Sequence, residues 1–143
     1  MSKIKQLRLA QALHNEQACL FIDTNGSFND WVVTTAFYAA IHFVKYKIFP
    51  LTIHEGKIEI IDSFEQYFGK YYNPHDSKHA AILKLVKVEC IHISLEYREL
   101  KDICWGTRYT DYRVDPDIAR RAKEILGVIK TYCNPPKQHN TTA

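Results

Sequence analysis

The chain has 143 residues, of which 46% are hydrophobic, 13% aromatic and 24% charged, with five Gly and five Pro. These values describe one packed globular domain and exclude a collagen-like, low-complexity or largely disordered chain. The net charge of +3 is far below that of a chain coated with cations for nucleic acid. The whole excess lies in residues 101–143, with eight basic and five acidic side chains, because residues 1–100 hold eleven of each.

The first predicted helix begins at a Ser2 cap and runs to about Ile22. Its stripe at three- and four-residue spacing comprises Ile4, Leu7, His14, Ala18 and Phe21. Residues 23–26, Asp-Thr-Asn-Gly, predict a turn, because Asn-Gly readily adopts the positive φ that turns need.

The second predicted helix opens at residues 27–30, which have the form of a capping box, and runs from about Phe28 to Ile48, before Pro50. It is apolar nearly all round, which is typical of a central helix. One stripe comprises Val33, Phe37, Ile41, Val44 and Ile48. A second stripe comprises Trp31, Tyr38 and His42.

Residues 52–55 also have capping-box form and predict a third helix that ends at Gly69. This helix would carry Ile58, Ile61, Phe64 and Phe68. A cap at Asp76 or Ser77 then predicts one long fourth helix that ends at Trp105-Gly106. Its seam has the 4-4-3-4-3-4 spacing of coiled-coil packing and comprises Ile82, Val86, Cys90, Ile93, Tyr97, Leu100 and Cys104.

The last predicted helix is capped and started by Asp115-Pro116. Its inward residues would be Ile118, Ala122, Ile125, Ile129 and Tyr132. No alternating strand of useful length is evident, so we expect an all-α fold, an up-and-down bundle of four or five helices. Residues 1–133 would form this single domain, and residues 134–143 a disordered tail.

Four dispersed cysteines suggest buried free thiols in a reducing compartment; they are Cys19, Cys90, Cys104 and Cys133. With no signal-peptide core and no membrane-length apolar stretch, we expect a cytoplasmic protein without membrane contact. The common nucleotide and hydrolase motifs are absent, and His75 and His79 are separated by a helix start, so we expect no cofactor and no metal.

Two groups of residues could carry chemistry. The first is the stripe of Trp31, Tyr38 and His42, which either faces a ligand or lies in the core. The second is the predicted loop 108–113, Arg-Tyr-Thr-Asp-Tyr-Arg, which suits a phosphate held by arginine and a base stacked on tyrosine. Alternatively, Arg108 pairs with Asp111 and the tyrosines cover the end of the bundle.

The segment 30–42, which reads DWVVTTAFYAAIH, resembles the "dW…FYaalH" helix of HEPN-domain proteins. His54 is similar to the single histidine that precedes that family's third helix, and Tyr97 to Leu100 followed by Arg108-Tyr109 resembles a later stretch. The similarity spans Ser27 to Cys133. It implies a helical bundle, frequent homodimers, and roles in toxin–antitoxin, phage-defence or RNA-processing systems.

The active branch of that family consists of metal-independent ribonucleases with an Arg followed four to six residues later by a His. Here positions 112, 113 and 114 are Tyr, Arg and Val. Arg8 and His14 have the required separation, but they lie about 120° apart on one helix, and we treat the match as chance.

Three hypotheses follow. In the preferred one, a HEPN-like module, which we expect to be a homodimer, binds RNA or a nucleotide without proven catalysis. Its ligand-binding residues would be Trp31, Tyr38, His42, Tyr97, Arg108, Tyr109 and Tyr112. In the second, the protein is a metal-independent endoribonuclease that uses Arg108 with His42 or His54. In the third, the seam of the long helix pairs with a second copy or with a partner protein encoded nearby.

Overall fold

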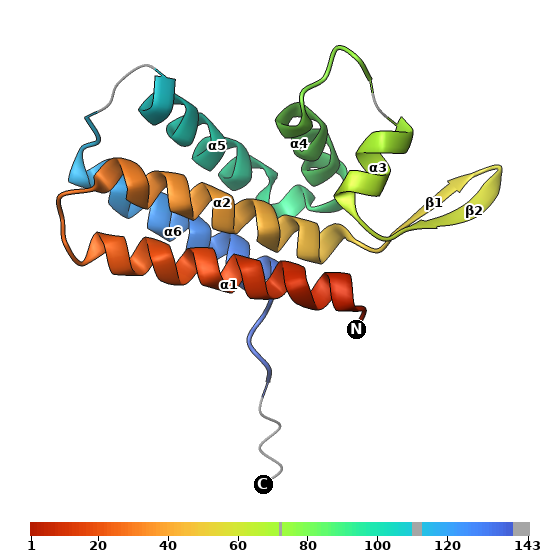
Figure 1. Cartoon of the computed structure of the whole chain (residues 1–143), viewed down its shortest axis with the longest axis horizontal. Helices are drawn as coiled ribbons and strands as arrows, with labels where there is room; N and C mark the ends of the chain where they lie inside the picture. Colours follow the sequence, from red (N-terminus) through yellow and green to blue (C-terminus); the bar gives the residue numbers. More distant parts are fainter. Residues whose placement is uncertain (72, 110–112, 139–143) are drawn as a thin grey trace, which may run out of the picture.

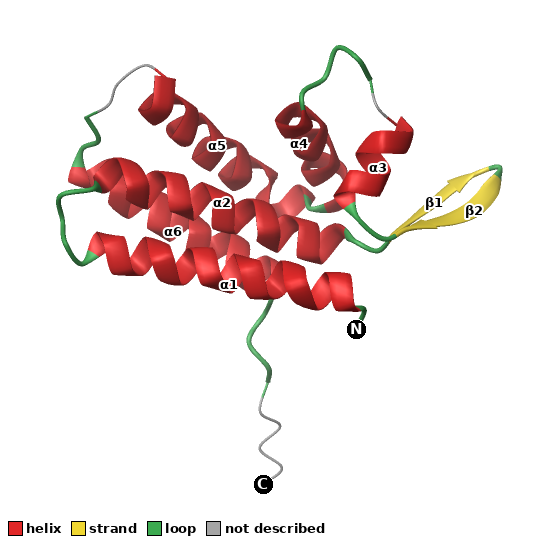
Figure 2. Cartoon of the chain, in the orientation of Figure 1, coloured by secondary structure: helices red, strands yellow, loops and turns green. Residues whose placement is uncertain are grey.

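A computed structural model describes residues 1–71, 73–109 and 113–138, with the side chain of residue 109 left out. The described chain is mostly helical, with one two-stranded sheet at its edge (Figures 1 and 2). Its elements are α1 (Lys3–Asp23), α2 (Asn29–Ile48), β1 (Leu51–Glu55), β2 (Lys57–Ile61), α3 (Phe64–Tyr71), α4 (Lys78–Glu89), the 3-10 turn η1 (Ile91–Ile93), α5 (Ser94–Tyr109) and α6 (Pro116–Cys133).

The central element is α2, as its apolar sequence predicts. It packs against α1 and α6 in one layer, and α4 and α5 lie across its other side (Figure 1). The first predicted stripe is confirmed as core, because all its members are at most 7% exposed: Val33, Phe37, Ile41, Val44 and Ile48. Its burial against four helices is the main apolar contribution to the fold.

Three predicted helix caps are confirmed. The hydroxyl of Ser2 accepts from the amide of Lys5, and that of Ser77 accepts from the amide of Ala80. The carboxylate of Asp115 accepts from the amide two residues on, and Pro116 is the first residue of α6. The predicted cap of α2 is wrong, because Phe28 occupies that position and makes no side-chain cap bond.

The stripe predicted for the first helix does not face the core. Ala12 and Cys19 are the fully buried residues of α1, whereas Leu7 is 59% and Phe21 79% exposed. Small side chains let α1 approach α2 closely, and this selects the Ala12–Cys19 face over the larger apolar residues on the other face. The turn that follows is confirmed, with Gly26 at φ 77°.

The predicted third helix is wrong over its first half. The prediction of a purely helical fold is wrong for the same reason. Residues 51–61 form an antiparallel hairpin in which Ile53 pairs with Glu59 and His54 with Ile58. Gly56 turns the chain at φ 77°, a conformation that a helix does not contain. The β-branched residues around it favour strands and alternate between a half-buried and an exposed face. Only α3 remains helical.

The predicted fourth helix is divided. Cys90 leaves helical geometry with φ −133° and ends α4, and η1 connects it to α5. The seam is nevertheless buried throughout, because spacing specifies which side chains face the core and does not require one straight axis. The predicted end at Trp105-Gly106 is also wrong, since α5 continues to Tyr109.

In α6, burial of Ala122, Ile125 and Ile129 is confirmed, but Ile118 is 41% exposed. All four cysteines are buried and free, as predicted. The predicted tail begins in a loop at Asn134, and its residues 139–143 lie outside the described residues. No helix in the described part of the chain is long and apolar enough to cross a membrane.

Candidate functional site

The second predicted stripe of α2 is not in the core. Trp31 is 56% and Tyr38 39% exposed, and His42 and Lys45 are half-buried on the same side of the helix. Helical spacing aligns these four side chains. Around His42 this face borders two hollows, one lined with α1 and the other with α3 and α4, and we call the two together the groove; Trp31 lines neither hollow.

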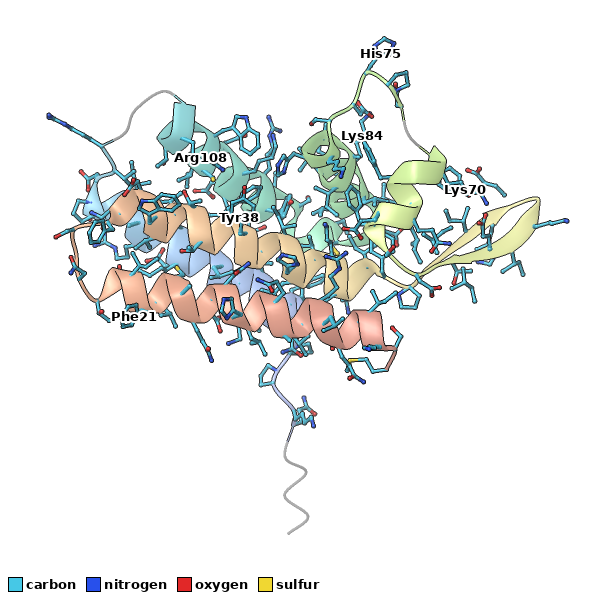
Figure 3. All side chains as sticks on the ribbon, in the orientation of Figure 1. Phe21, Tyr38, Lys70, His75, Lys84 and Arg108 are labelled. Carbon is cyan, nitrogen blue, oxygen red and sulfur yellow. The ribbon has the colours of Figure 1, made fainter. Side chains whose placement is uncertain are left out.

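Arg108 comes to this face from the last turn of α5. Its Nη1 donates to the hydroxyl of Tyr38 over 3.2 Å, and Figure 3 shows the two residues one above the other. The sequence predicted Arg108 in a loop, whereas the structure has it on a helix, where its backbone is held by α5. Tyr112 and the side chain of Tyr109 lie outside the described residues. Arg113 borders a different hollow beside Ile103 and Ile118.

A cleft of about 220 Å³ lies in the groove beside Tyr38. It is formed by α2 with α3 and α4, and its lining combines apolar, cationic and imidazole groups: Tyr38, Ile41, His42, Lys45, Phe64, Glu65, Lys78, His79 and Ile82. This combination suits a ligand with an anionic group and a flat ring.

His42 is held neutral in this cleft. Its Nδ1 is buried and has no hydrogen-bond partner among the described residues. Burial, with the nearby charges of Lys45 and Arg8, lowers the pKa of His42 from 6.5 to about 4. At neutral pH its imidazole can accept a hydrogen bond, and it contributes no charge.

His79, on the first turn of α4, lies close enough to the Arg108 guanidinium for that charge to affect its pKa. Its ring lies 4.8 Å from that of Trp105 and 5.9 Å from that of Phe37. Burial lowers the pKa of His79, and Lys101, Lys45 and Arg108 lower it further. In the sequence His79 stands out only as half of a metal pair with His75. Its position three residues before Ile82, on the buried seam, was the signal that it faces α2.

Glu65 is the acidic residue of the cleft. Its carboxylate pairs with Arg8 from α1 and, at 3.3 Å, with the Nζ of Lys45. Burial opposes the charge of Glu65, but its own backbone amide, Lys45 and Arg8 outweigh burial and lower its pKa. The carboxylate therefore holds two cations at one point of the groove wall.

Positive charge gathers around this groove. Lys78 lines the cleft, and Lys101 lies 5.3 Å from the centre of the Trp105 ring beside His79. Arg8, Lys45 and Arg108 also lie at or beside the groove, and Glu65 is the acidic residue among those that line the cleft. Cationic side chains therefore outnumber the carboxylates among the described residues that line the cleft.

Two candidate residues do not join this site. His54 is exposed on β1, in the hairpin that projects from the end of the molecule away from Arg108 (Figures 1 and 3). Tyr97 is fully buried against Phe37, and its hydroxyl has no hydrogen-bond partner in the described part of the chain. Since His42 Nδ1 also lacks a partner, these two groups are not bonded to each other.

Metal ligation finds no support in the part of the chain that the structure describes. No three His, Cys, Asp or Glu side chains there are grouped as a metal site requires. His75 precedes the Ser77 cap, so α4 carries His79 alone.

The chain matches no protein-family model, no curated protein and no solved structure. Its function must therefore be argued from the groove itself.

Proposed function

We propose that the protein binds single-stranded RNA in the groove along α2. The observation that supports this most directly is the Arg108–Tyr38 contact beside a cleft that holds Lys45 and Lys78. Arginine and lysine neutralise phosphates, and exposed aromatic rings stack on unpaired bases. The resemblance of segment 30–42 to HEPN-domain proteins agrees with a role in RNA biology.

Single-stranded RNA suits the groove better than a duplex does. Trp31 and Tyr38 lie seven residues apart on one helix face, which is about 10 Å along the axis at 1.5 Å per residue. Aromatic side chains at this spacing can stack only on bases that are not paired with a second strand. The strand would run along α2, with its phosphates toward the cations of α4 and α5.

The test is a fluorescence-anisotropy titration of a labelled single-stranded RNA 12-mer at several salt concentrations. Arg108→Ala and Lys78→Ala should each weaken binding about fivefold and reduce the salt dependence by about one counterion. Arg120→Ala is the matched control, because Arg120 lies exposed on α6 and pairs with Asp117. An equal loss in the control, or no binding by the wild type at 50 mM salt, would contradict the proposal.

A second candidate function, metal-independent RNA cleavage, draws on the two imidazoles in one cleft. Burial lowers the pKa of both His42 and His79, which makes each a weaker base but keeps its imidazole unprotonated, the form that a general base for the 2′-hydroxyl needs. A neutral imidazole cannot protonate the leaving oxygen, and Lys45, whose pKa burial lowers, is the cleft's proton donor in this scheme.

Incubation of RNA with the protein and a chelator tests for cleavage. His42→Ala and His79→Ala should then abolish it, whereas His54→Ala should leave it unchanged. Absent cleavage, or cleavage that persists in both cleft variants, excludes this second function and leaves the binding proposal to be judged by the titration.

A further inference from the structure

A second hollow lies on the other side of His42. It has a volume of about 410 Å³, it is bordered by α1 and α2, and its lining differs from that of the cleft: Ile4, Leu7, Arg8, Gln11 and His42. Ile4 is 44% and Leu7 59% exposed, so α1 presents apolar side chains to solvent here. An amide and a guanidinium interrupt this apolar wall.

Gln11 is oriented within this hollow. Its Nε2 donates to the Oδ1 of Asn15 over 3.1 Å, one helical turn further along α1. This bond leaves the carbonyl oxygen of Gln11 and its second N–H for a ligand. A donor and an acceptor side by side match the hydrogen-bonding edge of a nucleobase, which is how glutamine reads adenine.

The hollow and the cleft are neighbours, because the side chain of His42 lines both. Arg8 of the hollow pairs with Glu65 of the cleft, so cationic charge lies at their junction. A ligand that fills both would have an anionic part on the Lys45 side and a flat part with one polar edge on the α1 side. One nucleotide unit has this division.

We infer that the hollow on α1 is a nucleobase subsite, with Ile4 and Leu7 against the base and Gln11 selecting it. This inference rests on the proposed binding of RNA and adds base preference to it. The cations contribute affinity that does not depend on the RNA sequence, and Gln11 discriminates between bases. His42 lies between the cleft and the hollow. Because its ring is neutral, it can stack on the base without repelling the cations around it.

The experiment compares labelled nine-residue RNAs of adenosine, cytidine and uridine by anisotropy. We expect the wild type to prefer the adenosine strand about tenfold over the weakest strand, and Gln11→Leu to reduce this ratio to about twofold or less. Gln17→Leu is the matched control, since Gln17 is exposed on the same helix outside the hollow. Lys78→Ala should weaken all three RNAs equally and keep the ratio.

The outcomes separate the two proposals. If the RNAs bind and Lys78→Ala weakens them, but no base preference exists or Gln11→Leu does not change it, the base subsite is overturned and RNA binding stands. If no RNA binds, both fall. Leu7→Asp, checked for folding by circular dichroism, should also reduce the ratio. If it instead alters only sedimentation, the hollow is a protein contact and the inference is wrong.

Discussion

The two faces of α2 have different roles in the molecule. On one face Phe37 and Val44 are at most 1% exposed and contact the surrounding helices. On the other, Trp31 is exposed, and Tyr38 and His42 line a cleft together with Lys45 and Lys78. Both faces are apolar or aromatic in sequence, so hydrophobicity does not distinguish a packing surface from a binding surface. The side chains contributed by other helices do: apolar groups on the first, lysine and arginine on the second.

The largest difference between the faces should be in stability. Phe37→Ala removes a ring that contacts Tyr97 and Trp105, and should lower the free energy of unfolding by about 3–5 kcal/mol. Trp31→Ala, on the groove face, should cost less than about 1 kcal/mol. Urea denaturation measures both. Similar losses for the two variants would show that Trp31 belongs to the core after all.

The next effect concerns His42 and pH. Its folded pKa lies below its unfolded value of 6.5, so protonation favours the unfolded chain, and stability is lost as pH falls from about 6.5 to about 4. Over that range the wild type should lose on the order of 2 kcal/mol more than His42→Gln does. His54→Gln, which alters an exposed residue, should follow the wild type. Parallel curves for wild type and His42→Gln would contradict a buried neutral imidazole.

A smaller effect is expected from Glu65, the residue that places a negative charge on the groove face. Glu65→Gln should release Arg8 and Lys45 and raise the affinity for single-stranded RNA about three- to tenfold at low salt. Glu99→Gln is the control, since Glu99 pairs with Arg121. Weaker RNA binding by Glu65→Gln would mean that the carboxylate positions the cations instead of competing with the ligand.

The smallest effect should come from Tyr97, whose ring belongs to the packing side. Its hydroxyl is buried without a partner among the described residues, and burial raises its pKa. Tyr97→Phe should leave stability unchanged or raise it by up to about 1 kcal/mol. RNA affinity should not change. A loss of affinity would restore Tyr97 to the ligand-binding residues that the sequence suggested.

Local signals in the sequence were sufficient for several features. Caps such as Ser77 and Asp115 depend on one side chain and its neighbouring amides, and the burial of Phe37 depends on helical periodicity. The hairpin was missed because residues 52–55 fit a capping box as well as a strand. The break at Cys90 carries no Gly or Pro, so no helix-breaking residue signals it in the sequence.

The candidate site was predictable only in part. Helical periodicity places Tyr38 and His42 on one helix face and so predicts them as candidates. Arg108 is predicted because tyrosines and a second arginine follow it in the sequence. Their meeting depends on the angle at which α5 crosses α2, which no local pattern encodes. Glu65 lies on α3, whose start the predicted third helix misplaces. His79 follows the correctly predicted Ser77 cap, but in the sequence it stands out only as half of a metal pair with His75.

The reactivity of the buried thiols can report local unfolding of the protein. Cys19 in α1, Cys104 in α5 and Cys133 in α6 are each at most 3% exposed, and burial raises their pKa values. An aromatic disulfide reagent can react only with molecules in which a helix has detached. The labelling rate of each cysteine would therefore measure how often its own helix opens, with no probe added to the chain.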